Sequence, residues 1–533
     1  MEYRPRQLHS PACGLLAAAL LAAVACGGSG QGTAVAVDAA ATAGRTGTGP
    51  TSSEAVAADL PRGLVTKEAG VSGGYLLFGP LLSDTTYLMD NDGSIVHTWT
   101  SQFAPSGTAY LLDSGNLLRG AREPGVDVFR GGGQGGRIEE FNWEGEKVWD
   151  FEFASEEHLL HHDIEIMPNG NILAIAWETK SADEAIAAGR DPATTPADGL
   201  WPDMVVEIEP QRPSGGRIVW EWHAWDHLLQ SRDPAVPDYG DPAEHPERID
   251  INATGVAPEI DPEELEQLKA LGYMPPDATA EDASSDMFHT NAIAYNAELD
   301  QIALSSPRYS EVWIIDHSTT TSEAAGSLGG RWGKGGDLLY RWGNAANYGR
   351  GTEDDRQLFE QHDVRWIPDG LAGAGHLMIF NNDVPAEAGT DNHSEVIEIA
   401  PPLGVRGYEL AAGAPFGPAE PVWSYRATGE PSFYSPFISG ATRQPNGNTL
   451  ICAGAPGRFL EVTPAGQIVW DYRDPHSGDV RMPDGSTPHP VGEFTYAVFR
   501  ASRIPPDHPA LAGKTLSPLE PQPPLAGVAG SGG

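Results

Sequence analysis

The stretch Phe459-Leu460-Glu461-Val462-Thr463-Pro464-Ala465-Gly466-Gln467-Ile468-Val469-Trp470-Asp471-Tyr472 decides the fold. It contains an alternating strand, a turn at Gly466 and a second strand whose aromatic residues stand two positions apart. Because successive side chains of a strand point to opposite faces, Trp470 and Tyr472 share one face. The pattern predicts a β-hairpin with one apolar aromatic face.

Five earlier stretches repeat this hairpin, each with a strand, a turn and a second aromatic strand. They are residues 87–99, 138–151, 205–222, 312–342 and 396–425. A different hairpin is marked between copies by Asn-Gly and related pairs, which supply the positive φ angles of a tight turn. These pairs are Ser114-Gly115, Asn169-Gly170, Asp369-Gly370 and Asn446-Gly447. Two hairpins per repeat make a unit of four strands.

The spacing of the repeats indicates a β-propeller. Equivalent aromatic positions stand as close as 52 residues (His97 to Trp149) and 47 residues (Trp423 to Trp470), which suits a four-stranded blade. The six copies predict an all-β, six-bladed β-propeller, and seven blades is the alternative. A strand-like segment at 494–499 follows the last copy. Joining it to the first hairpin would close the ring and leave no open sheet edge.

The two ends of the chain lack the repeat. Residues 1–25 have a positive start and an apolar run too short to span a bilayer, followed by small residues before Cys26. This predicts a lipoprotein-type signal peptide and lipidation of Cys26; an ordinary secretory peptide is the alternative. We expect a flexible tether at 26–65, the propeller at 66–515 and a disordered tail at 516–533. A partly helical insertion is expected at about 225–285.

Composition restricts the partners and the compartment. Asp and Glu number 74 against 33 Lys and Arg, a net charge of -41, and such a surface repels nucleic acid and anionic lipid. Removal of the signal peptide and lipidation of Cys26 would leave Cys452 as the one remaining cysteine, so no intrachain disulfide is expected. We predict an exported protein, lipid-anchored on the outer side of the cytoplasmic membrane or in the outer membrane.

A histidine recurs at one register of the second hairpin. His162, His289 and His362 each stand seven residues before the Asn or Asp of the following turn. The equivalent positions elsewhere are Gly107 and Ser439, so the fold does not require a histidine there. If this hairpin is the inner one, the three imidazoles meet near one mouth of the central channel. The alternative is that each imidazole only caps its strand.

Two further residues favour an anion-binding site. Arg308 follows the strand expected to pair back from His289, and Asn291 follows that histidine. Together they describe a site that binds an anion and moves protons. Zinc is a weaker alternative, since no acidic or Cys ligand recurs at this register. We expect no metal ion and no cofactor, and His227 and His245 of the insertion are either structural or part of the site.

The chain resembles the bacterial arylsulfotransferase (aryl-sulfate sulfotransferase) family from about Gly73 to Leu511. The matching stretches include Trp225-Asp226-His227-Leu228-Leu229-Gln230, His289-Thr290-Asn291, Arg341-Trp342-Gly343-Asn344, Gln361-His362-Asp363 and Pro445-Asn446-Gly447-Asn448. No single stretch is specific, but together they are. The resemblance implies a six-bladed propeller, in agreement with the count of hairpins.

The resemblance also implies a reaction. A sulfuryl group would pass from an aryl sulfate ester to a phenolic acceptor in a ping-pong cycle, without a nucleotide sulfate donor. The family's nucleophile, a histidine that is transiently sulfated, corresponds to His362, and its supporting histidines correspond to His162 and His289. The family's sulfate-binding residues correspond to Asn291 and Arg308. The expected partners are therefore a phenolic sulfate donor and a phenolic acceptor.

Several points stay open at the level of sequence. An aryl sulfate hydrolase and a non-catalytic ligand-binding lipoprotein propeller are the alternative functions. Either His162 or His289 would protonate the departing phenolate and deprotonate the acceptor. Tyr348, Phe433 and Tyr434 are candidates for holding a phenol ring.

Overall fold

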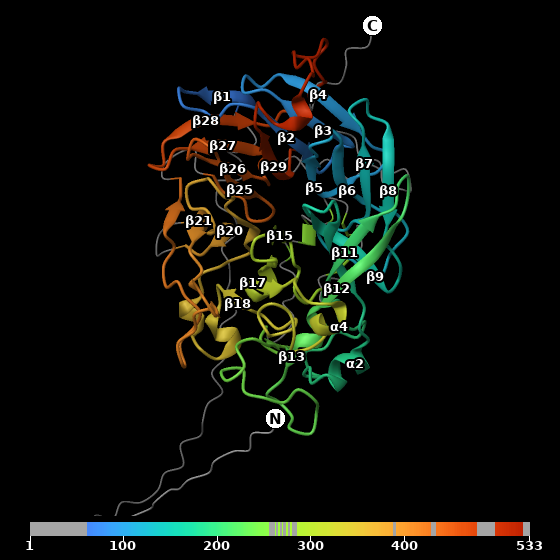
Figure 1. The fold of residues 1–533 in the computed structure, drawn as a ribbon, viewed down its shortest axis with the longest axis vertical. Helices are drawn as coiled ribbons and strands as arrows, with labels where there is room; N and C mark the ends of the chain where they lie inside the picture. The colour runs from blue at the N-terminus through green and yellow to red at the C-terminus, as the bar shows by residue number, and fades with distance from the viewer. Residues whose placement is uncertain are drawn as a thin grey trace, which may run out of the picture. The chain divides into compact units, whose positions relative to one another are not determined.

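The computed structural model describes residues 61–254, 285–386, 391–427, 433–476 and 496–525, together with 262, 265, 266, 269, 273, 274, 278 and 279. Six antiparallel sheets follow one another in a ring (Figure 1). This confirms the six-bladed β-propeller and excludes the seven-bladed alternative. We number the sheets as blades 1 to 6 in chain order.

Each blade contains four strands from the channel outward, and blade 6 has a fifth at its outer edge. Blade 1 comprises β29 (Val498–Ile504), β2 (Tyr75–Pro80), β3 (Thr85–Met89) and β4 (Ile95–Thr100). Blade 2 comprises β5 (Pro105–Leu111), β6 (Leu117–Arg122), β7 (Gly136–Phe141) and β8 (Lys147–Glu152). Blade 3 comprises β9 (His158–Ile166), β10 (Ile172–Glu178), β11 (Asp203–Pro210) and β12 (Gly216–His223).

The second half of the ring has the same order. Blade 4 comprises β15 (Ala292–Asn296), β16 (Gln301–Ser306), β17 (Glu311–Asp316) and β18 (Tyr340–Trp342). Blade 5 comprises β19 (His362–Trp366), β20 (Leu377–Val384), β21 (His393–Ile399) and β24 (Trp423–Tyr425). Blade 6 comprises β25 (Gly440–Arg443), β26 (Thr449–Ala453), β27 (Arg458–Val462), β28 (Ile468–Arg473) and β1 (Gly63–Lys67).

Short elements fill the connections between the strands. The helices are α2 (Ala182–Ala187), α4 (Thr321–Ala324) and the 3₁₀ turns η1 (Ala224–His227), η3 (Pro307–Tyr309), η4 (Ala345–Tyr348), η5 (Glu353–Asp355) and η6 (Pro509–Leu511). Two small ladders pair β13 (Leu228–Leu229) with β14 (Ile249–Asp250) and β22 (Leu403–Gly404) with β23 (Gly407–Tyr408). No helix among the described residues is both long and apolar enough to cross a bilayer.

Both ends of the chain close the ring. β29, near the C-terminus, is the inner strand of blade 1 and pairs with β2, with Tyr75 opposite Ile504. β1, near the N-terminus, pairs with the outer strand β28 of blade 6. The predicted closure by joined terminal strands is therefore confirmed, and blade 1 is completed only by a strand from the far end of the sequence.

The repeated aromatic hairpin forms the outer half of each blade and joins it to the next. In every outer strand a buried or half-buried Trp donates its indole N–H to a backbone carbonyl of the following blade, over 2.8–3.1 Å. The donors are Trp99, Trp149, Trp222, Trp342, Trp423 and Trp470, and the acceptors are Asn142, Gly215, Gly336, Pro418, Pro464 and Asn91. The aromatic repeat therefore has a physical role, because each indole packs in a seam and also ties that seam.

The chain segments outside the predicted propeller boundaries are only partly described. The signal peptide with Cys26 and most of the tether lie outside the described residues, as does most of the second half (255–284) of the predicted insertion. Residues 516–525, placed in the tail by the sequence, contact blade 1: the Leu519 N–H donates to Ile95 O over 2.9 Å. Cys452, the cysteine expected to remain without a disulfide partner, is buried in β26 with a free thiol.

Candidate active site

Irregular pairing at the inner strands re-aims the predicted histidines. In β9, three residues (161–163) stand opposite the single residue Ile175, and in β19 two residues stand opposite Ile379. Such bulges break the side-chain alternation of a strand and are frequent beside active sites. His162 and His289 also have positive φ angles of 53° and 54°, an uncommon conformation for residues other than glycine. The backbone is therefore specialised at the register that carries the histidines.

The structure brings the three imidazoles together, two of them beside one aromatic ring. The rings of His162 and His289 lie 4.5 Å apart, edge to face. Phe499, on the closing strand β29, lies 6.1 Å from the His162 ring and 6.4 Å from the His362 ring. His162 and His362 are 4% and 5% exposed, and His289 is half-buried. The three residues predicted from their common register thus form one cluster at the channel.

The contacts of His362 define a neutral imidazole. Its Nδ1 lies 2.9 Å from Glu360 O and 3.0 Å from Asn382 Oδ1, and both oxygens accept its proton. Its Nε2 accepts the backbone N–H of Ile438 over 3.2 Å, so Nε2 carries the lone pair. Burial lowers the pKa of His362 to about 3, and the neighbouring His289 acts in the same direction. This imidazole is unprotonated at neutral pH and is a competent nucleophile.

His162 lies in a tight pocket that a glycine makes possible. A Cβ added to Gly133, which has a φ of +76°, would lie 2.3 Å from the His162 ring. Burial lowers the pKa of His162 well below its ordinary value, and nearby His289, His161 and His362 add to the effect. The protonated form of His162 is therefore disfavoured unless the ring can pass a proton to a neighbouring group.

His289 differs from the other two because it has a carboxylate partner. Its Nδ1 lies 2.5 Å from Asp286 Oδ2, and Asp286 Oδ1 accepts the Trp177 indole N–H over 3.2 Å. Burial alone would raise the pKa of Asp286, but His289 and Arg308 lower it overall. Asp286 is therefore a carboxylate, and it places a negative charge beside the His289 ring.

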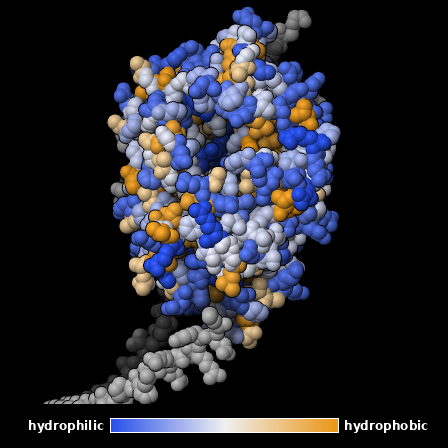
Figure 2. Space-filling model, in the orientation of Figure 1, coloured by the Kyte–Doolittle hydropathy of each residue, from blue (hydrophilic) through white to orange (hydrophobic). Residues whose placement is uncertain are grey.

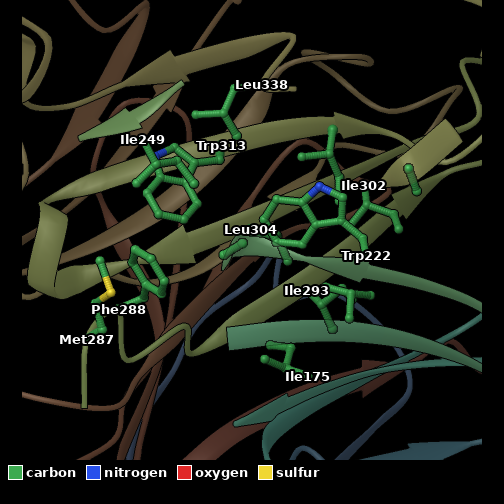
Figure 3. Close-up of a cluster of buried hydrophobic side chains, with 14 of the residues drawn as sticks. Ile175, Trp222, Ile249, Met287, Phe288, Ile293, Ile302, Leu304, Trp313 and Leu338 are labelled. Carbon is green, nitrogen blue, oxygen red and sulfur yellow. The ribbon is translucent and has the colours of Figure 1, made fainter. Parts of the chain in front are cut away.

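Arg308 lies beside this pair. It belongs to η3, directly after β16, and its backbone N–H donates to Phe288 O over 3.4 Å. Phe288 is fully buried and packs on Tyr309 and Trp313, with ring centroids 5.1 and 5.4 Å away. Figure 3 shows Phe288 among the apolar side chains that fill this seam. Phe288 precedes His289 and Tyr309 follows Arg308, so these two buried aromatic residues anchor both polar ones.

Asn291 has a supporting position. Its side-chain amide donates to Gln361 O over 2.8 Å, and its backbone carbonyl accepts a hydrogen bond from Arg500. Its Oδ1 is buried without a hydrogen-bond partner among the described residues. Asn291 therefore links the start of β15 to the residue that precedes His362.

Arg500 is a central residue that reasoning from the sequence missed. Its guanidinium contacts Asp163 Oδ2 at 2.6 Å and Asp363 Oδ1 at 2.9 Å, and it donates to Asn291 O at 3.2 Å. Asp163 and Asp363 directly follow His162 and His362, so one buried cation joins the three strands that carry the cluster. Aligning Phe499-Arg500 with the two His-Asp pairs would have located it.

We call Arg500 with Asp163 and Asp363 the clamp, and the residues beside the clamp are also polar. Arg365 pairs with Asp363 at 2.7 Å, and the Tyr110 hydroxyl donates to Asp163 over 3.3 Å. Burial raises the pKa of the nearby Glu165 carboxyl to about 8, although Arg365 opposes the shift. Figure 2 shows one face of the ring hollowed at its middle, with hydrophilic residues inside.

Tyr273 of the insertion also approaches the site. It is 6% exposed and packs in one cluster with Ile438 and Phe499, the neighbours of His362. The guanidinium of Arg122 lies 3.7 Å from the centre of its ring. At least this residue of the insertion therefore covers the end of the channel where the histidines lie.

Other candidates lie elsewhere. His227 is buried in the apolar seam and contacts Asp337 Oδ1 and Ala324 O at 2.8 Å each, which makes it structural. His245 is about half-exposed and contacts Glu247 at 3.2 Å. No group of His, Cys, Asp or Glu side chains in the described part of the chain is arranged to hold a metal ion.

For two of the three aromatic residues, the suggestion that they bind a phenol ring was wrong. Tyr348 and Phe433 are 2% exposed and belong to blade cores, where Phe433 stacks on Tyr425. Tyr434 is exposed and donates its hydroxyl proton to Asp383 over 2.7 Å. The aromatic rings that contact the histidines are instead Phe499 and Trp177.

Comparison with known proteins identifies the family. The sequence profile of the family described as Arylsulfotransferase (ASST) matches residues 81–477, which include the whole cluster except the closing strand. The chain belongs to this family. The arylsulfotransferases are enzymes, and membership implies aryl sulfate substrates. No curated protein matches the sequence.

Solved structures similar to this arylsulfotransferase are distant. A Bacteroides caccae protein of unknown function is 11% identical, with a TM-score of 0.38, covering 76% of this chain and 94% of its own. A putative 6-phosphogluconolactonase from Bacteroides fragilis is 10% identical, with a TM-score of 0.34 and coverages of 83% and 86%. A virginiamycin B lyase from Staphylococcus aureus is 9% identical, with a TM-score of 0.31 and coverages of 76% and 87%.

Proposed function

We propose that this arylsulfotransferase transfers a sulfuryl group from an aryl sulfate ester to a phenol through a sulfo-His362 intermediate. The observation that carries the proposal is the neutral imidazole of His362, whose Nδ1 proton is held by Glu360 O and Asn382 Oδ1 while Nε2 keeps its lone pair. The fixed tautomer presents one nucleophilic nitrogen beside two further imidazoles and within reach of an arginine-carboxylate pair.

In the first half-reaction, Nε2 of His362 attacks the sulfur of the donor. The N–S bond forms as the S–O bond to the phenolate breaks, and the phenolate leaves with the bonding electron pair. Attack displaces the Ile438 N–H from Nε2, which frees that donor for a sulfuryl oxygen. Arg308 and His289, whose charge Asp286 stabilises, attract the remaining oxygens.

In the second half-reaction, the acceptor phenol attacks the sulfur of sulfo-His362. The new S–O bond forms as the N–S bond breaks, and the imidazole regains its lone pair. The phenol must lose its proton as it attacks, because its ordinary pKa of about 10 leaves it protonated at neutral pH. We assign this proton to His162, and we assign His289, whose Nδ1 is paired with Asp286, to the sulfuryl oxygens.

One assay separates this proposal from the two alternatives. The protein is incubated with 4-nitrophenyl sulfate, with and without added phenol, and released nitrophenolate is followed together with phenyl sulfate. The proposal requires multiple turnovers that depend on phenol and yield phenyl sulfate. Release of nitrophenolate without phenol would show a hydrolase. Absence of both nitrophenolate and phenyl sulfate would favour a non-catalytic binding protein.

We further propose that the protein is exported and anchored through a lipid on Cys26, on the outer side of the cytoplasmic membrane or in the outer membrane. The short apolar run ending in small residues before Cys26 supports this proposal. Metabolic labelling with a radioactive fatty acid tests it, with Cys26→Ser as the matched control. Equal labelling of the two proteins would contradict lipidation at this site.

A further inference from the structure

A fourth histidine lies behind the cluster. His161 directly precedes His162 in β9, is 3% exposed and stacks on Trp177, with ring centroids 4.1 Å apart. Its Nδ1 lies 2.7 Å from the Nδ1 of His162. Its Nε2 lies 3.3 Å from Oδ1 of the buried Asp203. A carboxylate and two imidazoles therefore follow one another in a row that ends at the candidate site.

The bulge in β9 makes this row possible. Adjacent residues of a regular strand point to opposite faces, so consecutive imidazoles would not meet. The φ angle of +53° at His162 breaks the alternation and brings the two Nδ1 atoms together. An uncommon backbone conformation is thus maintained where two imidazoles share a hydrogen bond.

The contacts assign the protons. Only one hydrogen fits between the two facing Nδ1 atoms, so one ring donates and the other accepts. Asp203 Oδ1 lies 3.3 Å from Nε2 of His161, and neither atom has a hydrogen-bond partner of good geometry among the described residues. A carboxylate favours a proton on the facing nitrogen, so neutral His161 carries its hydrogen on Nε2. His162 then donates from Nδ1 and keeps its lone pair on Nε2.

Asp203 is itself fixed in place. Its Oδ2 accepts the backbone N–H of Thr290, the residue after His289, over 2.8 Å. The Nε2 edge of His162 lies against Gly133, where a Cβ would come within 2.3 Å. The row is therefore held at its carboxylate end by blade 4, and its His162 end packs closely against Gly133, where no larger residue would fit.

We propose that Asp203, His161 and His162 form a proton relay that takes the proton of the acceptor phenol and returns it to the next departing phenolate. This inference rests on the proposed sulfuryl transfer. As the phenol oxygen attacks the sulfur, its proton passes to Nε2 of His162. The Nδ1 proton of His162 passes to Nδ1 of His161, which becomes an imidazolium paired with the Asp203 carboxylate. His162 remains neutral, now protonated on Nε2.

The next donor restores the starting state. As its S–O bond breaks, the phenolate takes the Nε2 proton of His162, and His162 takes back the proton from Nδ1 of His161. One proton is taken up and one is released in each cycle, so no external acid or base is consumed. The two half-reactions therefore use the same relay in opposite directions.

The relay explains how a poor base can accept a proton. His162 is surrounded by His289, His362 and Arg500, all of which disfavour a positive charge on its ring. The relay moves that charge one imidazole further, to a ring that faces a carboxylate. General acid-base catalysis contributes about 10²–10⁴-fold to a rate.

The test separates the two half-reactions in His161→Gln and Asp203→Asn. With 4-nitrophenyl sulfate and no acceptor, the nitrophenolate leaves without needing a proton. We therefore expect the single-turnover release of nitrophenolate to change less than about threefold, because proton transfer is not part of this step. Transfer from sulfo-enzyme to phenol should fall about 100-fold. The loss should shrink as the acceptor is changed to more acidic phenols.

A purely structural role predicts a different pattern. If His161 only supports the fold of β9, release and transfer fall together and equally for every acceptor, which overturns the relay. Asp203→Asn keeps the shape of the side chain and an oxygen for the Thr290 N–H, so it tests the relay if His161→Gln does not fold. His376→Gln, which removes a carboxylate-paired histidine outside the cluster, is the matched control and should behave as the wild type.

The same experiment distinguishes the two proposals. A wild-type protein that neither releases one equivalent of nitrophenolate nor forms phenyl sulfate would refute the sulfuryl transfer itself. A wild-type protein that does both, with variants that show no dependence on acceptor acidity, would refute only the relay. Selective loss with weakly acidic phenols in both variants supports the two proposals together.

Discussion

His362 and His317 are the same side chain in opposite electrostatic surroundings. At the channel, His362 is buried against a carbonyl and an amide, and its pKa falls to about 3. Between blades 3 and 4, His317 contacts Glu207 at 3.1 Å and Asp300 at 2.7 Å. Burial also opposes charge on His317, but the two carboxylates raise its pKa above the ordinary value. The partner, rather than burial, therefore decides which imidazole stays neutral and which becomes a structural cation.

Replacement of the channel imidazole should have the largest effect. His362→Ala removes the proposed nucleophile, and we expect turnover with 4-nitrophenyl sulfate and phenol to fall by about 10⁴-fold or more. The measurement is steady-state release of nitrophenolate, with far-UV circular dichroism to verify the fold. His376→Ala is the control and should retain wild-type turnover. Comparable turnover in the two variants would place the nucleophile elsewhere.

Replacing Arg500, which joins Asp163 and Asp363 next to the histidines, should lower the stability of the fold more than any surface change. Arg500→Met leaves two buried carboxylates, Asp163 and Asp363, without their shared cation, which should lower the free energy of unfolding by about 3–5 kcal/mol. Urea denaturation gives the value. Arg217→Met breaks the exposed pair with Glu209 and should cost less than about 1 kcal/mol. Equal losses in the two variants would show that the buried clamp has no special role.

The contrast between the two imidazoles predicts an unusual pH profile. Since the pKa of His362 is about 3, its neutral fraction is unchanged between pH 8 and pH 5. The rate of single-turnover release from 4-nitrophenyl sulfate should therefore change less than about twofold. With a nucleophilic histidine of ordinary pKa, this rate would fall about thirtyfold. Stopped-flow absorbance across this range provides the test. A decline centred near pH 6.5 would show that the nucleophile is not held neutral by its surroundings.

The structural imidazole should show the opposite dependence. The folded-state pKa of His317 is higher than the value of about 6.5 in the unfolded chain, so its charge stabilises the fold fully below that pH. This contribution is lost as the pH rises through the folded pKa. His317→Gln keeps neutral donors and should cost about 1 kcal/mol at pH 6 and little at pH 9. A pH-independent difference in Tm between the two proteins would contradict a charged His317.

The repeated features of the molecule could be predicted, and the unrepeated ones could not. Blade number and the cluster of His162, His289 and His362 follow from patterns that recur at fixed register, so each copy supports the others. Arg500 was missed because its strand comes from the far end of the chain and completes the first blade. His161 was missed because strand alternation places it opposite His162, and only the bulge reverses this.

Residue type alone also failed to separate core from channel. Tyr348 and Phe433 were suggested as ring-binding residues but fill blade cores, whereas Phe499 lies between two of the histidines. Every blade contains aromatic residues at its seams, so an aromatic side chain carries little information about position. The position of Phe499 depends on how the terminal strand enters the ring, which no local pattern records.

The Trp470 indole, which hydrogen-bonds to Asn91 O, has a consequence for how the protein is made. This contact joins residues 379 positions apart in the sequence, and the pairing of β29 with β2 also joins distant parts of the chain. The Trp470 contact cannot form before blade 6 has been synthesised, and the β29–β2 pairing cannot form while the ribosome or an export channel still holds the last strand. The three-histidine cluster, to which that strand contributes Phe499 and Arg500, is therefore complete only after release, so a truncated or half-translocated polypeptide lacks it.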